Sequence, residues 1–290
     1  MQEYLSLPVL DGIGFYILVG VALLLFFLEL SIPLRQWRFS KKKRYWHNVS
    51  LSLIGLPMAR LLLLPITFIW AGILKEEGFG LLNWINVPQW LAMLLGIVAL
   101  DYGIYLWHRL NHISPFLWRF HNVHHLDLDM DISTGIRFHF GEMLLSIPFR
   151  ILVIALAGVQ PLTIVVYEVI FEVATLFHHS NIKLPRKLEL ILAQLIITPK
   201  QHGIHHSVVQ NESNSNYGTV FNIWDRLHGS SIMNISQRKV DIGVPAYRDE
   251  AELNLGFLLK SPTLRQRPWQ FPNKEIPKRT SKEMSDKKLK

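Results

Sequence analysis

The sequence predicts an all-α integral membrane protein: a transmembrane helix bundle with a cytoplasmic helical cap that carries a histidine-rich site. Three observations lead to this prediction. Half of the 290 residues are hydrophobic and only 18% are charged, whereas about a quarter are charged in a typical soluble domain. Several apolar runs reach the roughly 20 residues that a helix needs to cross a bilayer. Eight of the 13 histidines fall into three short clusters near the ends of such runs.

Five apolar segments are predicted to be transmembrane helices. The second of them contains Pro57 and Pro65, which are expected to bend the helix rather than end it, because proline is tolerated in membrane helices. The last two are joined by the tight turn AGVQP and are expected to form a hairpin, which either crosses the membrane or re-enters it. The segments cover residues 12–34, 49–74, 87–107, 142–159 and 162–178.

The basic residues predict the orientation. The first connection, RQWRFSKKKRYW, has six Lys or Arg and no acid, whereas the second, KEEGFGLLNWINVP, has one Lys and two Glu. Basic loops favour the cytoplasmic side, so the stretch 108–125 and everything after His179 are expected there too. The membrane is either a bacterial inner membrane or the endoplasmic reticulum.

The net charge of +8 is attributed to this topology. Residues 260–290 are strongly basic and are expected to form a solvated arm near anionic lipid. Nucleic-acid binding is not expected, because the basic residues are not interleaved with an aromatic stacking platform.

The histidine clusters predict a site for two metal ions. Residues four apart on a helix share a face, and each cluster contains such a pair. The chain has no cysteine, so His, Asp, Glu or Asn must hold any metal. Eight imidazoles exceed the three to five ligands that one catalytic metal uses, which favours two metals. The clusters are His108 and His112; His121, His124 and His125; and His202, His205 and His206.

The motifs that are absent narrow the chemistry. The chain has no HExxH, GxSxG or glycine-rich phosphate loop, which disfavours hydrolysis. Imidazole suits iron as well as zinc. A site that opens onto a bilayer meets substrates whose reactive handles are C–H bonds, and iron with O₂ supplies the oxidant that such bonds need.

The histidine pattern followed by TPKQHGIHHSVVQNESNSNYGTVFNIWDRLHG resembles the fatty acid hydroxylase/sterol desaturase superfamily of integral-membrane di-iron oxygenases, most closely its sterol desaturase-like branch. The resemblance covers about residues 90–230. It implies a non-haem centre of two Fe, with O₂ as co-substrate, that hydroxylates or desaturates a C–H bond of a membrane lipid of the sterol, fatty acyl or ether-lipid type.

The resemblance also implies a ligand set and a partner. The eight clustered histidines match iron ligands, and His179 in FHHSN matches a further family histidine, with His178 as the neighbour that could substitute. No nicotinamide, flavin or haem motif is recognisable, so a separate electron donor of the ferredoxin or cytochrome b5 type is expected. The chain divides accordingly into N-terminal helices with a basic loop (1–86), a catalytic region (87–232) and a basic cytoplasmic tail (233–290).

The chain departs from the family pattern at two places. It has WDRLHGS where many relatives have WDRLFGT, so His228 is an extra histidine with an expected structural or solvent-facing position. The stretch RFHFGE resembles the family's RxHPxE without its proline. His139 and Glu142 are therefore expected around the site or its channel rather than among the ligands.

Polar residues beside the clusters are candidates for supporting the ligands. Asp101 shares a helical stripe with His108 and is expected to accept a hydrogen bond from a ligand histidine. Glu172 either supports the metal site or forms an ion pair, with Arg109 or Arg119 as the opposite charge. Asn216 is a candidate for holding an ordered water near the metals.

Two other functional classes stay open. One is a metal transporter or sensor, including a zinc protein, although transporters place their ligands near the bilayer midplane and these histidines fall at one face. The other is a non-catalytic relative of the family, which metal-dependent oxygen uptake would distinguish from an enzyme.

Overall fold

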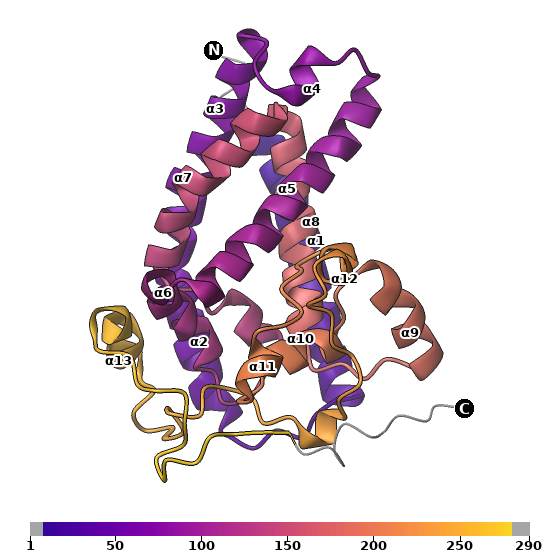
Figure 1. Ribbon diagram of the computed structural model, residues 1–290. Coiled ribbons are helices and arrows are strands. Elements are labelled where there is room, and N and C mark those ends of the chain that lie inside the picture. Colours follow the sequence, from indigo (N-terminus) through magenta and orange to yellow (C-terminus); the bar gives the residue numbers. More distant parts are fainter. Residues whose placement is uncertain (1–7, 280–290) are drawn as a thin grey trace.

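The structure is a computed structural model that describes residues 8–279, and these residues form helices and loops with no β-strand. Figure 1 shows an elongated molecule in which long helices extend toward one end and short helices gather around the other. Five units are long and apolar enough to cross a membrane: Gly12–Ser31, Lys41–Trp84, Gln89–Ile113, Phe140–Ala157 and Pro161–His179. The predicted all-α membrane architecture is confirmed.

The long helices are α1 (Pro8–Ser31), α2 (Lys41–Met58), α3 (Leu64–Glu76), α5 (Gln89–Ile113), α7 (Phe140–Ala157) and α8 (Pro161–His179). A single π-helical stretch, η2 (Ala59–Leu63), joins α2 to α3 without a break. It lies between Pro57 and Pro65, neither of which can donate a backbone hydrogen bond, so the bonding pattern changes there. The two prolines do not end the helix, as the sequence predicted.

The cap is the group of short helices at the lower end of Figure 1, whereas α4 (Leu81–Trp84) lies at the opposite end. The loop 32–40, the stretch 114–139 and the chain after His179 all lie at the cap end, as the alternation of spans predicts. The cap contains α6 (Pro115–His125), η3 (Ile132–Ile136), α9 (Arg186–Leu195), α10 (Pro199–His205), α11 (Gln210–Ser213), α12 (Ile223–Leu227), η4 (Gln237–Lys239), α13 (Leu255–Lys260) and η5 (Ser261–Thr263).

The core of the long helices lies between α3, α5, α7 and α8 and includes Leu100, Ile154 and Tyr167. Helices α5 and α7 approach closely at Gly103, where a Cβ atom would lie 2.9 Å from Val153 Cγ1. The outer faces are apolar as well; Leu61, for example, is 72% exposed. A continuous apolar exterior of this kind is stable against lipid rather than water.

The predicted hairpin is formed by α7 and α8. Helix α7 ends at Gly158, whose φ of 71° is the left-handed conformation that glycine adopts without strain. Helix α8 begins at Pro161, and each of the two helices is long enough to cross a membrane. Their lengths favour crossing over re-entry.

The C-terminal segment does not form the expected solvated arm over its described part, residues 260–279. Trp269 Nε1 donates to Val208 O at 2.7 Å, and Arg279 forms an ion pair with Glu212 at 2.7 Å. The expectation was wrong for these residues because apolar and aromatic side chains separated by basic ones anchor the segment to the cap. The chain ends in KKLK, a sequence that fits an endoplasmic-reticulum dilysine retrieval pattern. These final residues lie outside the described residues.

Candidate metal centre

Four helices bring the predicted ligands together at the cap end of the bundle. Helix α5 supplies two of them, α6 three and α8 one, while α10 and the residue after it supply three. Ser114 ends α5 and caps α6, where its side chain accepts a hydrogen bond from Leu117 N and Pro115 occupies the first turn. This sharp connection folds the histidines of α6 back against those of α5.

The nine predicted ligand histidines form two groups. Within each group, one ligand atom per residue lies within 4.8 Å of all the others. Among the described residues, none of the other four histidines belongs to either group. The first histidine group is His108, His112, His121, His125 and His205, and the second histidine group is His124, His179, His202 and His206.

Helical periodicity explains how the ligands divide. Residues four apart share a face, whereas consecutive residues point about 100° apart. In α6, His121 and His125 point to the first histidine group, and His124 points to the second. In α10 the arrangement is reversed, since His202 and His206 serve the second group. Each of these clusters therefore bridges both groups.

Most of these histidines use one ring nitrogen to contact an oxygen acceptor away from the centre. Six do so through Nδ1, at 2.7–3.3 Å. Since carbonyl, amide and carboxylate oxygens cannot donate, Nδ1 carries the proton and Nε2 keeps its lone pair. The partners are Tyr217 O for His108, Asn214 Oδ1 for His112, Glu142 for His121, Arg137 O for His124, Thr175 O for His179 and Ser215 O for His205.

The remaining lone pairs converge in a manner that fits metal ions. In the second histidine group, His179 Nε2 lies 3.0 Å from both His124 Nε2 and His202 Nε2. Nitrogens at right angles and ~2.1 Å from one metal would be about 3.0 Å apart. In the first group, the buried Nε2 atoms of His108, His112 and His205 have no hydrogen-bond partner within residues 8–279. Acceptors facing one another repel unless a cation lies between them.

Five histidines of the two groups, those on α6 and at α10 that are named below, are held neutral. The neutral imidazole is the form that binds metal. Burial, followed by the charges of neighbouring histidines, holds the pKa of each well below the ordinary value for histidine. A protonated imidazole cannot be a ligand. This applies to His124, His125, His202, His205 and His206.

Glu142 is a supporting residue whose role the sequence left open. Its Oε1 atom lies 2.9 Å from His121 Nδ1 and accepts a second hydrogen bond from Asn111 Nδ2 at 3.2 Å. A carboxylate in this position fixes the ring and raises the basicity of the ligand nitrogen. The sequence feature that pointed to this role is the RFHFGE stretch. Its Glu142 lies in the first turn of α7.

The three histidines near the clusters that were not predicted as certain ligands have structural contacts. His139 caps α7 by accepting a hydrogen bond from Gly141 N at 3.0 Å. His178 Nδ1 lies 3.1 Å from Thr219 O, and it is His179, not His178, that joins the second histidine group. His228 is exposed and its ring stacks on Tyr105, in line with the structural position expected for it.

Asp101 does not contact a ligand histidine, so this prediction was wrong. It is fully buried and accepts hydrogen bonds from Trp224 Nε1 at 2.7 Å, Tyr167 Oη at 3.0 Å and Phe221 N at 3.1 Å. Helical spacing correctly placed Asp101 on the same face of α5 as His108. Donors from residues 220–224, which follow α10 in the chain, nevertheless occupy the Asp101 carboxylate. Asp101 fixes the loop whose Tyr217 carbonyl accepts from His108.

Glu172 and Asn216 also have other partners than the metal site. Glu172 pairs with Arg60 at 3.3 Å, so the ion-pair alternative applies, with a partner from η2 rather than Arg109 or Arg119. The Asn216 side chain donates to Gln201 O and Ile232 O and accepts from Ile232 N. These backbone contacts use the Asn216 amide to hold a loop against α10.

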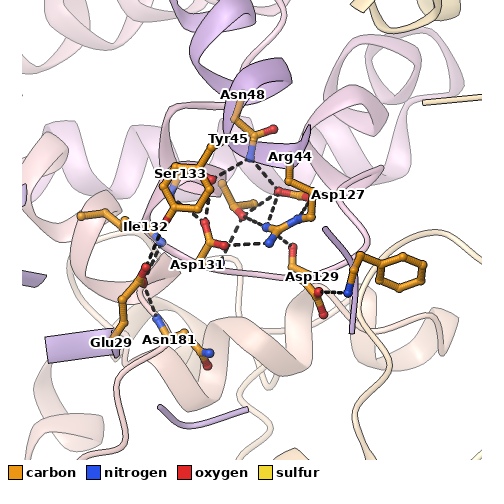
Figure 2. Close-up of polar contacts among 12 residues, drawn as sticks. Glu29, Arg44, Tyr45, Asn48, Asp127, Asp129, Asp131, Ile132, Ser133 and Asn181 are labelled. Atoms are coloured by element: carbon orange, nitrogen blue, oxygen red, sulfur yellow. Dashed lines mark hydrogen bonds and ion pairs between the residues drawn. The ribbon is translucent and has the colours of Figure 1, made fainter. Parts of the chain in front are cut away.

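A buried ionic network supports the loop that follows α6, and the sequence did not reveal it. Figure 2 shows Arg44 of α2 between Asp127 and Asp131, at 2.5 and 2.7 Å. Burial alone would raise the pKa of Asp127, but Arg44 and Arg137 lower it below the usual range for aspartate. Glu29 of α1 joins the network by accepting from Ile132 N at 3.1 Å. The network fixes the chain directly after His125.

Comparison with known proteins places part of the chain in a family. Residues 93–230 match the family described as fatty acid hydroxylase. This matched region contains all nine histidines of the two groups and the Glu142 carboxylate that supports them.

Residues 93–230 of this chain belong to the fatty acid hydroxylase family.

Curated relatives match about half of the chain. The ornithine lipid hydroxylase OlsE of Rhizobium tropici is 35% identical over 160 residues, which is 54% of this chain and 46% of the relative. Alkylglycerol monooxygenase of Homo sapiens is 30% identical, over 53% of this chain and 33% of the relative. Cholesterol 25-hydroxylase of Mus musculus is 27% identical, over 52% of this chain and 54% of the relative.

The matches thus span from a third to about half of the length of these relatives. No solved structure matches the chain at a significant level.

Proposed function

We propose that this protein is an O₂-dependent, non-haem di-iron hydroxylase of a membrane lipid. The observation that carries the proposal is the pair of buried histidine groups at the end of a membrane helix bundle. The named relatives include hydroxylases and a monooxygenase of an ornithine lipid, an alkylglycerol and cholesterol. These names support hydroxylation over desaturation and support a lipid substrate.

The proposed ligands are the nine histidines of the two groups, one metal to each group, within a catalytic region of residues 87–232. The donor set supports this assignment because imidazoles suit iron, zinc or copper, whereas carboxylate-rich sites suit magnesium or calcium. Iron held there would supply the oxidising power to insert one oxygen atom of O₂ into a C–H bond, with two external electrons and two protons forming water from the other.

The chain's own residues orient the ligands and exclude water. The Nδ1 hydrogen bonds of six histidines fix their tautomers, so that each Nε2 lone pair points inward before any metal binds. Seven of the nine histidines of the two groups, all but His108 and His112, are at most 3% exposed, which keeps bulk water from the centre. Glu142 holds the His121 ring, and the network around Arg44 holds the end of α6.

The electrons come, in this proposal, from a separate protein of the ferredoxin or cytochrome b5 type. The basic first loop supports a cytoplasmic cap, in either a bacterial inner membrane or the endoplasmic reticulum. An acidic carrier would then meet the cap from the cytoplasm.

Metal analysis with Mössbauer spectroscopy on protein from ⁵⁷Fe-grown cells tests the proposal. We expect about two irons per chain in a coupled pair, and ¹⁸O₂ label in a hydroxylated lipid. His124→Ala should lose iron, whereas the matched variant His228→Ala, at an exposed histidine outside both groups, should keep it. Zinc in place of iron would instead favour the metal transporter or sensor class. A chain that holds iron but takes up no oxygen with lipid and reductant would be a non-catalytic relative.

A further inference from the structure

A large groove opens beside the cap, between the end of α1 and helix α9. Its volume is about 1120 Å³, enough for a lipid headgroup with its glycerol. The segments on its floor directly follow two membrane spans, since α1 ends at Ser31 and α8 at His179. These segments pair through Leu34 N and Asn181 O at 2.8 Å. The groove therefore lies at the height of the membrane surface.

The lining of the groove is strongly basic. Two carboxylates also line it, and both are already engaged: Asp129 accepts from the backbone of Arg38 and Phe39, and Glu189 accepts from Thr198. The cations thus outnumber the acids by six to two. They are Arg35, Arg38, Lys183, Arg186, Lys200 and Arg238.

Four of these cations have no side-chain partner. Among the residues that the structure describes, the side chains of Lys183, Arg186, Lys200 and Arg238 form no ion pair or hydrogen bond, and all but the half-buried Lys200 are exposed. Arg38, by contrast, pairs with Asp241, which lies outside the lining of the groove. Like charges gathered around one concavity repel one another unless an anion occupies it.

Three buried N–H groups in the groove wall, on two side chains, also lack acceptors among the residues that the structure describes. Arg35 is 9% exposed, and its Nη1 donates to Gln237 Oε1 at 2.6 Å, but Nε and Nη2 have no partner. Trp37, two residues along the same extended segment, has an unpartnered Nε1. Burial lowers the pKa of Arg35 to about 10, so the group is still charged at neutral pH. A buried guanidinium with two N–H groups left without acceptors is costly, and an anion beside it relieves that cost.

The apolar surroundings indicate where the anion comes from. Leu34, Leu184 and Leu190 line the groove together with the cations. On the outer face of α9, Ile191 and Leu195 are 63% and 65% exposed, so α9 has the amphipathic character of a helix that lies in the membrane interface. A groove lined by both cations and leucines, beside an amphipathic helix, matches a phosphate with attached acyl chains better than the polar surface of an acidic protein.

We propose that this groove binds the phosphate headgroup of an anionic membrane lipid, with Arg35 and Trp37 as donors and Lys183, Arg186 and Arg238 around the rim. Arg35 Nη1 also contacts Pro199 O, at 3.3 Å, at the start of the helix that carries His202. The lipid would thus bind at a site separate from the two histidine groups but joined to one of their helices.

Native mass spectrometry of the full chain released from nanodiscs tests this site. The discs contain equal amounts of phosphatidylglycerol and phosphatidylcholine with identical acyl chains. We expect the wild-type protein to retain phosphatidylglycerol, and the triple variant Lys183→Ala, Arg186→Ala, Arg238→Ala to retain at least ~10-fold less. The control removes the same charge from exposed positions outside the groove: Lys260→Ala, Arg265→Ala and Lys278→Ala. It should stay within about 2-fold of wild type.

Two conservative variants separate specific donors from overall charge. Arg35→Lys keeps the charge but loses the planar fork, and Trp37→Phe loses only the Nε1 donor. Both should retain less phosphatidylglycerol than the control triple variant. Neither readout depends on metal content or lipid oxidation, so failure of this proposal is distinguishable from failure of the proposed function.

Three outcomes would overturn the lipid assignment. The first is equal phosphatidylglycerol retention by the rim and control triple variants. The second is thermal stabilisation of the solubilised protein by inorganic phosphate without any preference for the anionic lipid. The third is a loss of ferredoxin or cytochrome b5 binding in the rim variant while its lipid retention is unchanged.

Discussion

The contact between Glu142 and His121 yields a quantitative prediction for metal affinity. His121 Nδ1 lies 2.9 Å from Glu142 Oε1, and both side chains are buried. A hydrogen bond to a charged acceptor contributes about 1.5–3 kcal/mol and one to a neutral acceptor about 0.5–1.5 kcal/mol. Glu142→Gln keeps an acceptor and should therefore weaken metal binding by ~1 kcal/mol, or roughly 5-fold.

Glu142→Leu should have a larger effect, because it leaves both the His121 N–H and Asn111 Nδ2 without an acceptor. Loss of such a supporting partner weakens metal binding by about 10- to 100-fold. The assay is competition for the metal between the solubilised protein and a chelator of known affinity. Glu252→Gln, at a cap carboxylate paired with Arg267 far from the histidines in sequence, is the control and should leave the affinity unchanged. Equal affinities for wild type, Glu142→Gln and Glu142→Leu would refute the reasoning.

Three further predictions concern the scaffold. Arg44→Ala leaves Asp127 and Asp131 buried without their cation and should destabilise the fold by ~3–5 kcal/mol. The measurement is the thermal unfolding temperature in detergent, which should fall, and Arg44→Lys should recover part of the lost stability. Asp101→Asn replaces one acceptor oxygen with an NH₂ donor that faces Trp224 Nε1 and Phe221 N or, in the flipped amide, Tyr167 Oη and Val220 N, so it should cost about 1–3 kcal/mol, visible as faster proteolysis of the loop. Removal of the metal by chelation should lower the unfolding temperature of the wild-type protein, since a ligand at 1,000 times its Kd contributes ~4 kcal/mol to the free energy of unfolding. An unfolding temperature that chelation leaves unchanged would contradict a contribution of the metal to the stability of the fold.

Much of the fold was predictable because a helix that crosses a membrane has a simple requirement in length and composition. A helix must expose apolar residues over a fixed length to cross lipid, so composition alone located five spans. The boundaries shifted where a helix continues into the cap: α5 extends beyond the predicted end at 107 to Ile113. That extension places His108 and His112 on one rigid helix.

Supporting contacts were less predictable because they depend on which loops meet which helices. The stripe that contains Asp101 was correct as a helical face, yet its partners come from residues 66 to 123 positions away. In the sequence, Glu142 is an ambiguous motif residue, and only the packing of α7 against α6 brings it to His121. The prediction of a solvated arm after residue 260 was wrong for the described residues because it rested on their charge and did not consider Trp269, which anchors the segment to the cap.

The sequence by itself predicted the membrane class and eight clustered histidines, because both depend on local length and spacing, whereas His179 was predicted only from the family resemblance. It also contained the division of α6 into two faces, since neighbouring residues on a helix point in different directions. Only the tertiary structure decided which faces meet: the α6 pair joins α5 and His205, while the α10 pair joins His124 and His179. It also decided that cations from distant segments line one groove. Such assignments depend on the packing of helices far apart in the chain, which no local pattern specifies.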